Sequence, residues 1–283
     1  MRLVLTKSNN TESTTQPAHH RPKLMHLLLV NPNSTESMTQ AAGQQVEAYL
    51  NKAYPGNFRD IEVSLFTGPP DAPPEIDGEK TSYESARKCL PLLCERTLDT
   101  QRKQYFDTFD GVLVACFSDH PLVHQLLAKT ESSTPVTGIF HASMTTCLSR
   151  PGAAFSIITS NDEWVELLDA GAEKLLGAPR PYAGSCCSFK GTIASSLPVL
   201  DLHNPKNLHA IAKRIYQENV RRLNTTTVIL GCAGFSGMEQ PLQQEIRNIA
   251  LEHDSSSQLN VTLLDSVVCG IETLALMCRL QFN

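Results

Sequence analysis

The chain has 283 residues, 41% of them hydrophobic, and a formal net charge of -5, which is enough material for one large or two medium domains with buried cores. It has no run of about 18 apolar residues and no charged-then-apolar leader at its start, so we expect no membrane contact and a cytoplasmic location. The acidic balance and the lack of a clustered Lys/Arg face predict no nucleic-acid partner.

In the first half of the chain, a polar segment precedes an alternation of strands and helices. Residues 1–23 are rich in Ser, Thr, Asn, Gln and His and predict a disordered extension. Ser34 and Asp119 stand where each could cap a helix. The expected elements are a strand at 24–30, a helix at 34–54, a strand at 61–66, a helical stretch at 80–105 kinked or split at Pro91, a strand at 112–116, a helix after 119 and a strand at 135–140.

The second half repeats this order of elements. The expected elements are a strand at 153–159, a helix at 162–176, a short strand near Tyr182, a helix at 205–223, a strand at 228–232, a helix that starts either at Ser236 or at Pro241, a strand at 260–265 and a helix from 266. Because strands alternate with helices twice over, we expect an α/β fold of two pseudo-symmetric lobes, each a mostly parallel sheet flanked by helices.

Residues with polar or nucleophilic side chains lie at the ends of four of the expected strands. Asn31-Pro32-Asn33 follows the first strand, Cys116 ends the third, and Thr159-Ser160 and Cys232 take the matching places in the second half. In open parallel sheets, ligands bind outside the carboxyl ends of the strands. If the two units face each other across those edges, both thiols point at one shared cleft that binds a small-molecule substrate.

Two opposed thiols suggest a particular chemistry. A thiolate close to a helix N-terminus is stabilised by the helix dipole and by unpaired backbone N–H groups, so we expect its pKa to be lowered. One thiolate can then remove a proton from a carbon acid while a thiol on the opposite side returns one, which inverts a stereocentre without a cofactor. This chemistry requires no metal.

With these motifs in this order, the chain from about residue 24 to its end resembles the aspartate/glutamate/hydantoin racemase superfamily, nearest the hydantoin and allantoin racemase branch. The motifs that carry the resemblance are Asn31-Pro32-Asn33-Ser34-Thr35, Ala115-Cys116-Phe117-Ser118-Asp119, Phe155-Ser156-Ile157-Ile158-Thr159-Ser160 and Leu230-Gly231-Cys232-Ala233-Gly234. The resemblance implies a two-base racemase that uses Cys116 and Cys232, has its active site between the lobes, and forms homo-oligomers.

The resemblance also implies lobe boundaries and substrate contacts. The first lobe would comprise 24–141 plus 259–283, because the last strand and helix return to it, and the second lobe would comprise 142–258. The residues that would hold the substrate are Asn33, Phe117, Ser118, Asp119, Thr159, Ser160, Ala233 and Gly234. The implied substrate is a 5-substituted hydantoin or allantoin.

The chain departs from the family pattern beside the first cysteine. The hydantoin branch typically has Cys-Phe-Gly-Asp-Pro-Gly, whereas this chain has Ser118 for the first glycine and His120-Pro121 after the aspartate. It also has His141 where that branch has the glutamate of Glu-Ala-Ala. We therefore regard His120 and His141 as candidate substrate contacts, with polar groups at helix starts as the alternative interpretation.

Several alternatives remain open at this point. An amino-acid racemase, a cofactor-free decarboxylase or isomerase of the same superfamily, and a catalytically silent ligand-binding protein share the expected fold. Retention of both cysteines favours racemisation over the related arylmalonate decarboxylases, which keep only the second-lobe cysteine. We interpret the remaining cysteines as thiols in structural roles, because cytosolic reductants keep thiols reduced, and the adjacent pair Cys186-Cys187 lacks the spacing of a zinc clamp.

Overall fold

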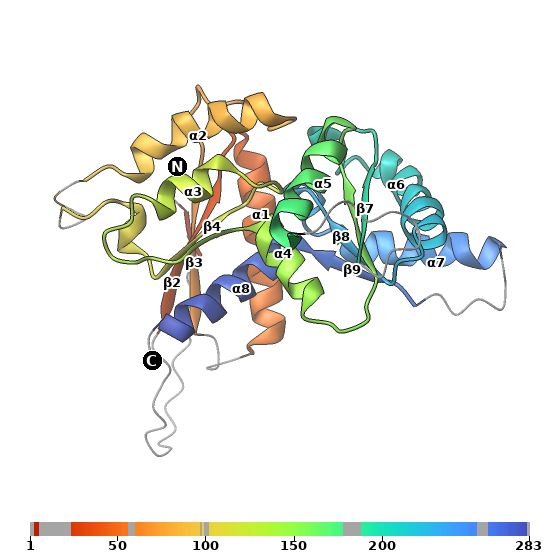
Figure 1. The fold of residues 1–283 in the computed structure, drawn as a ribbon. Helices are drawn as coiled ribbons and strands as arrows, with labels where there is room; N and C mark the ends of the chain where they lie inside the picture. The colour runs from red at the N-terminus through yellow and green to blue at the C-terminus, as the bar shows by residue number, and fades with distance from the viewer. Residues whose placement is uncertain are drawn as a thin grey trace, which may run out of the picture.

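The computed structural model describes residues 3–5, 24–55, 60–96, 98, 102–177, 188–253 and 260–281. These residues form two α/β lobes that lie side by side (Figure 1). Each lobe is built on four parallel strands flanked by helices, which confirms the expected fold class. Among the described residues, no helix combines the length and the apolar character needed to cross a bilayer.

Apart from the additional edge strand β1, the two sheets have the same strand order. The first runs β1-β3-β2-β4-β5 and the second β7-β6-β8-β9, so that β2 matches β6 and β4 matches β8 at the centre of each sheet. The strands of the first sheet are β1 (Leu3–Leu5, antiparallel to β3), β2 (Met25–Asn31), β3 (Ile61–Thr67), β4 (Gly111–Val114) and β5 (Val136–Gly138). Those of the second are β6 (Phe155–Thr159), β7 (Phe189–Ala194), β8 (Thr227–Leu230) and β9 (Thr262–Asp265).

Helices connect successive strands in both lobes. The α-helices are α1 (Glu36–Ala53), α2 (Glu79–Leu93), α3 (Pro121–Leu127), α4 (Ile139–Leu148), α5 (Glu163–Leu176), α6 (Leu208–Arg214), α7 (Glu239–His253) and α8 (Ser266–Gln281). The other helical segments are the 3₁₀ turns η2 (Phe106–Thr108), η3 (Val199–Asp201), η4 (Pro205–Asn207) and η6 (Ala233–Phe235), and the π-helical η5 (Ile215–Arg222). In the first lobe, α2 and α3 pack together on one side of the sheet, with α1 and α8 on the other (Figure 1).

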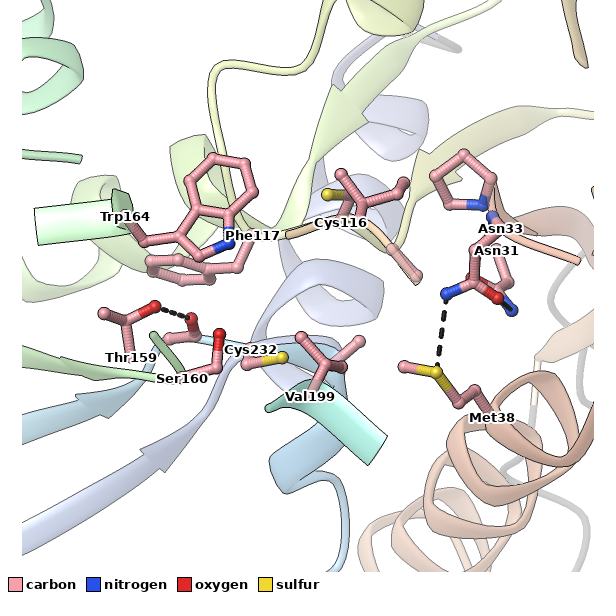
Figure 2. A pocket seen from close by; sticks show the side chains of 15 residues that line it. Asn31, Asn33, Met38, Cys116, Phe117, Thr159, Ser160, Trp164, Val199 and Cys232 are labelled. Carbon is pink, nitrogen blue, oxygen red and sulfur yellow. Dashed lines mark hydrogen bonds between the residues drawn. The ribbon is translucent and has the colours of Figure 1, made fainter. Parts of the chain in front are cut away.

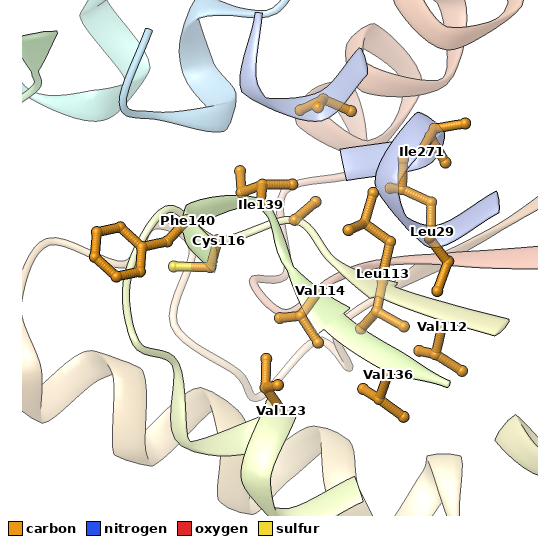
Figure 3. Close-up of a cluster of buried hydrophobic side chains, with 14 of the residues drawn as sticks. Leu29, Val112, Leu113, Val114, Cys116, Val123, Val136, Ile139, Phe140 and Ile271 are labelled. Carbon is orange, nitrogen blue, oxygen red and sulfur yellow. The ribbon is translucent and has the colours of Figure 1, made fainter. Parts of the chain in front are cut away.

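The last strand and the last helix belong to different lobes. Strand β9 pairs with β8 in the second sheet, whereas α8 packs against α1, α4 and β4 of the first lobe. Glycines permit this close crossing: a Cβ added at Gly270 would lie 2.8 Å from both methyl groups of Leu113, and one added at Gly111 would lie 2.7 Å from the Cys278 sulfur. Figure 3 shows Ile271 of α8 over the strands of the first sheet.

The expected lobe boundaries are therefore wrong in two places. The strand within 259–283 stays in the second lobe, because only there does it find a parallel partner in register. Helix α4, most of which was expected in the second lobe, packs on β5 and α8, and its residues Met144 and Cys147 lie in the core that fills the first lobe.

Several element boundaries also differ from expectation. Three residues of the expected disordered extension form β1, whose apolar sequence Leu-Val-Leu pairs with the free edge of β3. The helical stretch expected at 80–105 ends at Leu93, two residues after the proline that weakens its last turn. The strand expected at 135–140 ends at Gly138, where α4 begins at once. Strand β7 was not expected, and the strand expected near Tyr182 lies outside the described residues, as does Cys186-Cys187.

Helix starts show why capping was predicted incorrectly. Thr35, not Ser34, is the N-cap residue of α1, because the Ser34 hydroxyl donates instead to the carbonyl of Ala72 at 3.0 Å. The N-cap residue of α3 is His120, whose Nδ1 accepts from the backbone N–H of Leu122 at 3.2 Å, rather than Asp119. Helix α7 starts at Glu239, between the two expected starts, with Pro241 in its first turn, where a missing N–H costs little.

Candidate active site

A narrow cavity lies between the lobes at the carboxyl ends of the central strands (Figure 2). Its volume is about 30 Å³, which is room for no more than a few water molecules. The side chains and backbone of both lobes contribute to its wall. The lining residues are Asn31, Pro32, Asn33, Met38, Ile76, Ala115, Cys116, Phe117, Thr159, Ser160, Trp164, Val199, Gly231, Cys232 and Ala233.

Both candidate thiols line this cavity. Cys116 stands two residues after the end of β4 and Cys232 two residues after the end of β8, and these strands hold matching places in the two sheets. In Figure 2 the two cysteines lie on opposite walls. They are close enough for a negative charge on Cys232 to raise the pKa of Cys116. The fold thus brings together the two residues that the sequence paired.

Burial keeps both thiols protonated in this conformation. It raises the pKa of Cys116 to about 12, although a hydrogen bond with the Ser118 hydroxyl, 3.6 Å away, opposes the shift. It raises the pKa of Cys232 to about 11, with a further rise from the charge of Glu75 and opposition from the Gly234 N–H and from Ser160.

The lowered thiol pKa values expected from helix dipoles are therefore not found. Helix α3 begins only at Pro121, five residues beyond Cys116, so its N-terminal N–H groups are directed elsewhere. Cys232 caps η6, a single turn, and its sulfur accepts one N–H, from Gly234 at 3.3 Å. One such donor does not offset the loss of solvation.

Two asparagines form the polar part of the first-lobe wall. Asn31 is buried and donates to Asn33 Oδ1 at 2.8 Å and to Thr39 Oγ1 at 2.9 Å. Asn33 Oδ1 also accepts from the backbone N–H of Thr35 at 2.9 Å, which fixes the orientation of the amide. The Asn33 amide nitrogen has only the weak thioether acceptor of Met38, at 3.4 Å (Figure 2). That N–H group is therefore available to a ligand.

A serine supplies the matching polar group of the second-lobe wall. Thr159 Oγ1 donates to the carbonyl of Gly231 at 3.1 Å and so ties β6 to the cysteine loop. Ser160 is fully buried, and its hydroxyl has no regular hydrogen-bond partner, although it lies near enough to Cys232 to lower the pKa of that thiol. A buried hydroxyl without a partner is costly, so Ser160 is ready to bond a polar ligand atom.

Phe117 joins the lobes beside the cavity. Its ring packs edge to face on Phe140, with ring centroids 5.5 Å apart, and reaches across to Gly231 of the second lobe. A Cβ at Gly231 would lie 3.1 Å from the Phe117 ring and 2.4 Å from Ile157 Cγ2. Only glycine at this position lets the two lobes approach this closely.

Five of the expected site residues do not line the cavity. Ser118 and Gly234 lie outside the cavity lining, where each hydrogen-bonds a sulfur atom: Ser118 that of Cys116 and Gly234 that of Cys232. His120 is fully buried, accepts from the start of α3 through Nδ1, and bonds the Ser85 hydroxyl of α2 through Nε2 at 3.1 Å. Burial lowers the pKa of His120 to about 3, so the ring is neutral. Its contacts position the loop that carries Cys116.

The other two, Asp119 and His141, belong to a cluster outside the cavity lining. Asp119 Oδ1 lies 2.5 Å from His124 Nε2 and 3.4 Å from His141 Nε2, and its Oδ2 accepts from Lys174 of the second lobe at 2.7 Å. Although burial raises it, hydrogen bonds from Lys174 and His124 hold the pKa of the Asp119 carboxyl below its ordinary value. Burial lowers the pKa of His141.

The structure adds site residues that the sequence did not indicate. Met38, Ile76, Trp164 and Val199 all line the cavity, and none of them was expected in the site. Glu75 lies beside them on the loop before α2, with a buried Oε2 that has no hydrogen-bond partner. Glu75 sits in a proline-rich loop without periodicity, so no sequence signal could have placed it next to Cys232.

The sequence and the fold are both similar to those of known proteins. A model of the Asp/Glu/Hydantoin racemase family matches residues 27–274. Protein DCG1 of Saccharomyces cerevisiae is 38% identical over 226 residues, which are 79% of this chain and 86% of that protein. The fold is similar to an allantoin racemase from Pseudomonas fluorescens (TM-score 0.66, 21% identity, 91% and 92% of the two chains covered) and to one from Klebsiella pneumoniae (TM-score 0.65, 23% identity, 91% and 89% covered).

Proposed function

The chain belongs to the Asp/Glu/hydantoin racemase family, and from that premise we propose that it is a cofactor-independent racemase that uses Cys116 and Cys232 as opposed acid and base. The observation that carries the proposal is the placement of two thiols on opposite walls of one cavity, at matching strand ends of the two lobes. A single carbon centre held between them is accessible to a proton donor on one face and a base on the other.

The reaction conserves all atoms. One cysteine, as thiolate, removes the proton from the carbon next to the carbonyl. The electron pair of that C–H bond forms a C=C bond, and the π pair of the carbonyl moves onto its oxygen. The opposite thiol then delivers its proton to the other face of the carbon, which restores the carbonyl and leaves the second cysteine as thiolate. The Ser160 hydroxyl and the Asn33 amide N–H are the groups that can stabilise the negative oxygen, because both lack a strong partner and are held in place.

The cavity wall favours a neutral substrate over an amino acid. Among the described residues that line the cavity, none is Lys, Arg or His, so a substrate carboxylate would find no cationic partner. The unpartnered carboxylate oxygen of Glu75 near Cys232 adds negative potential on one side. A hydantoin or an allantoin-like ureide offers N–H donors and no carboxylate, which suits such a wall.

One observation favours a second candidate function. Both thiols have raised pKa values in the narrow cavity, as expected of a catalytically silent protein that binds ligands between its lobes. For a racemase, the same shifts mean that the active thiolate is a minor species at neutral pH.

Solvent exchange at the stereocentre distinguishes the candidates. We expect the purified protein to catalyse exchange of deuterium from D₂O into the stereocentre of hydantoins or allantoin, and to bring the optical rotation of these substrates to zero. Free amino acids should show neither effect. Cys116→Ser and Cys232→Ser should each suppress both signals severely. Cys94→Ser provides the control, because that thiol is half-buried directly after α2 and outside the cavity lining.

The outcomes separate the alternatives. Exchange that persists unchanged in both cavity variants would eliminate the two-base mechanism. Tight ligand binding without exchange in the unmodified protein would favour the silent binding protein, and exchange only with amino acids would favour the amino-acid racemase.

A further inference from the structure

The Asp119 cluster assembles three metal-ligand side chains from separate segments of the first lobe. Asp119 follows the Cys116 loop, His124 lies on α3 and His141 on α4. One donor atom of each lies within 4.8 Å of the others. The two rings are nearly perpendicular, with centroids 6.1 Å apart.

These distances are close to those of a metal site. Donor atoms bound to Zn²⁺ lie about 2.0–2.2 Å from the ion, which separates neighbouring donors by roughly 3.3 Å in a tetrahedron. His141 Nε2 already lies 3.4 Å from Asp119 Oδ1, whereas His124 Nε2, at 2.5 Å from the same oxygen, would have to move outward. The His124 side chain is 53% exposed, so it has room to move and leaves a path for an ion.

We propose that Asp119, His124 and His141 form a binding site for a first-row divalent cation of the zinc class, distinct from the cavity between the thiols. Two imidazoles and one carboxylate are a donor set that such ions accept, and water would complete the coordination. The site holds a metal through residues that the racemisation chemistry does not use, and it goes beyond the proposed function.

The metal would compete with an ion pair between the lobes. Lys174 of α5 donates to Asp119 Oδ2 at 2.7 Å, and its side chain is 70% exposed. A divalent cation on Oδ1 would repel that ammonium group and weaken its contact with Asp119. Metal binding would therefore loosen one connection between the lobes, and loss of the Lys174 charge would favour the metal.

Titration of the full chain with Co²⁺ and Zn²⁺ tests the proposal. We expect one Co²⁺ per chain with visible absorption typical of nitrogen and oxygen ligands, and calorimetric binding of one Zn²⁺. His124→Asn and His141→Gln should each weaken Zn²⁺ binding by at least about tenfold. Lys174→Met should tighten it severalfold.

Controls separate the site from other cation-binding groups. His209 forms an exposed pair with Glu245 at 2.6 Å, so His209→Gln removes a similar histidine outside the cluster and should leave the affinity unchanged. Because His124 is exposed, its variant should fold even if the His141 variant does not. Equal affinity in the His124 variant and the unmodified protein, or strong sulfur-to-cobalt charge-transfer absorption, would overturn the proposal, since the second result would place the ion on thiols.

Discussion

Cys116 and Cys232 occupy matching strand ends, but their surroundings differ. Cys116 has a hydroxyl beside it, from Ser118, and no backbone donor. Cys232 accepts a backbone N–H, lies near a second hydroxyl and feels the charge of Glu75 across the lobe boundary. The result is a pKa of about 12 for the first thiol and about 11 for the second.

Equivalent positions in two similar sheets therefore do not give the two thiols the same electrostatic surroundings or the same pKa. The sheets place both sulfur atoms, whereas the loops and the opposite lobe determine how readily each ionises. In the proposed mechanism, the two thiols remove protons from opposite enantiomers, so the two directions of racemisation should depend differently on pH. The following experiments test whether the two sides are unequal, in order of expected effect.

The largest effect should come from removing either thiol. Cys116→Ser and Cys232→Ser should each lower kcat for racemisation by about 10²–10⁴-fold, because a hydroxyl is far too weak an acid to replace the thiol in proton transfer. Polarimetry from both enantiomers measures the loss. If one variant keeps full activity in both directions, the two thiols do not act together as acid and base, and the proposed mechanism is wrong.

Acid stability should depend in part on His120, the buried N-cap residue of α3 that follows the Cys116 loop. His120 has a pKa of about 3 in the folded protein, below the value of about 6.5 expected for the unfolded chain. Stability from this group is therefore complete above pH 6.5 and is lost as the pH falls toward 3, at up to about 1.4 kcal/mol per pH unit.

Urea unfolding between pH 7 and pH 4 measures this dependence. His120→Gln should be less stable at pH 7, because it loses the contacts with Ser85 and Leu122, but its stability should fall less steeply with acid. The exposed His209→Gln serves as control. Parallel curves for the unmodified and His120 proteins would show that another group causes the acid loss.

The stability of the protein should depend differently on a methyl group at the two positions that precede the cysteines. Ala115 and Gly231 hold matching positions, but a Cβ at Gly231 meets Ile157 and the carbonyl of Ile158 at 2.9 Å. Gly231→Ala should therefore destabilise the protein by about 1–3 kcal/mol, whereas Ala115→Gly should cost about 1 kcal/mol or less. Thermal unfolding of both variants measures the difference, and equal losses would contradict the asymmetry.

The smallest effects should be opposite shifts in the pH profile. Glu75→Gln removes a negative charge that raises the pKa of Cys232, so the rise of kcat/KM with pH should move to lower pH. Ser118→Ala removes a hydrogen bond that lowers the pKa of Cys116, so that rise should move to higher pH. Each shift should be within about one pH unit. Shifts in the same direction would mean that these residues do not act on separate thiols.

Much of the fold followed from local apolar patterns. Residues 27–30 are buried on both faces of a parallel sheet, and such apolar runs indicate strands from the sequence alone. Both cysteines were placed at strand ends on this basis. Strand β7 was missed because partly exposed residues interrupt its apolar pattern at an edge. Lobe membership of α4 and β9 depends on long-range packing, which periodicity does not encode.

The candidate site was predictable where a residue directly follows a strand. Asn33, Thr159 and Ser160 line the cavity because the backbone of a central strand leads straight to it. Asp119 and His120 lie a few residues further on, where the turn sends one side chain outward and the other into the core. Trp164 lines the cavity, and Glu75 lies near Cys232, only because of the way helices and loops pack, which the local sequence does not show.

The crossing of α8 back onto the first lobe has a consequence for synthesis of the chain. During translation, strands β2 to β5 emerge early, but the helix that covers β4 and rests against Gly111 is made only after the whole second sheet. An apolar face of the first sheet therefore stays exposed while more than a hundred residues are added, and exposed apolar faces promote aggregation. The nascent chain should need protection until residues 266–281 leave the ribosome, and the docking of this helix should complete the first lobe after the strands of the second sheet have been made.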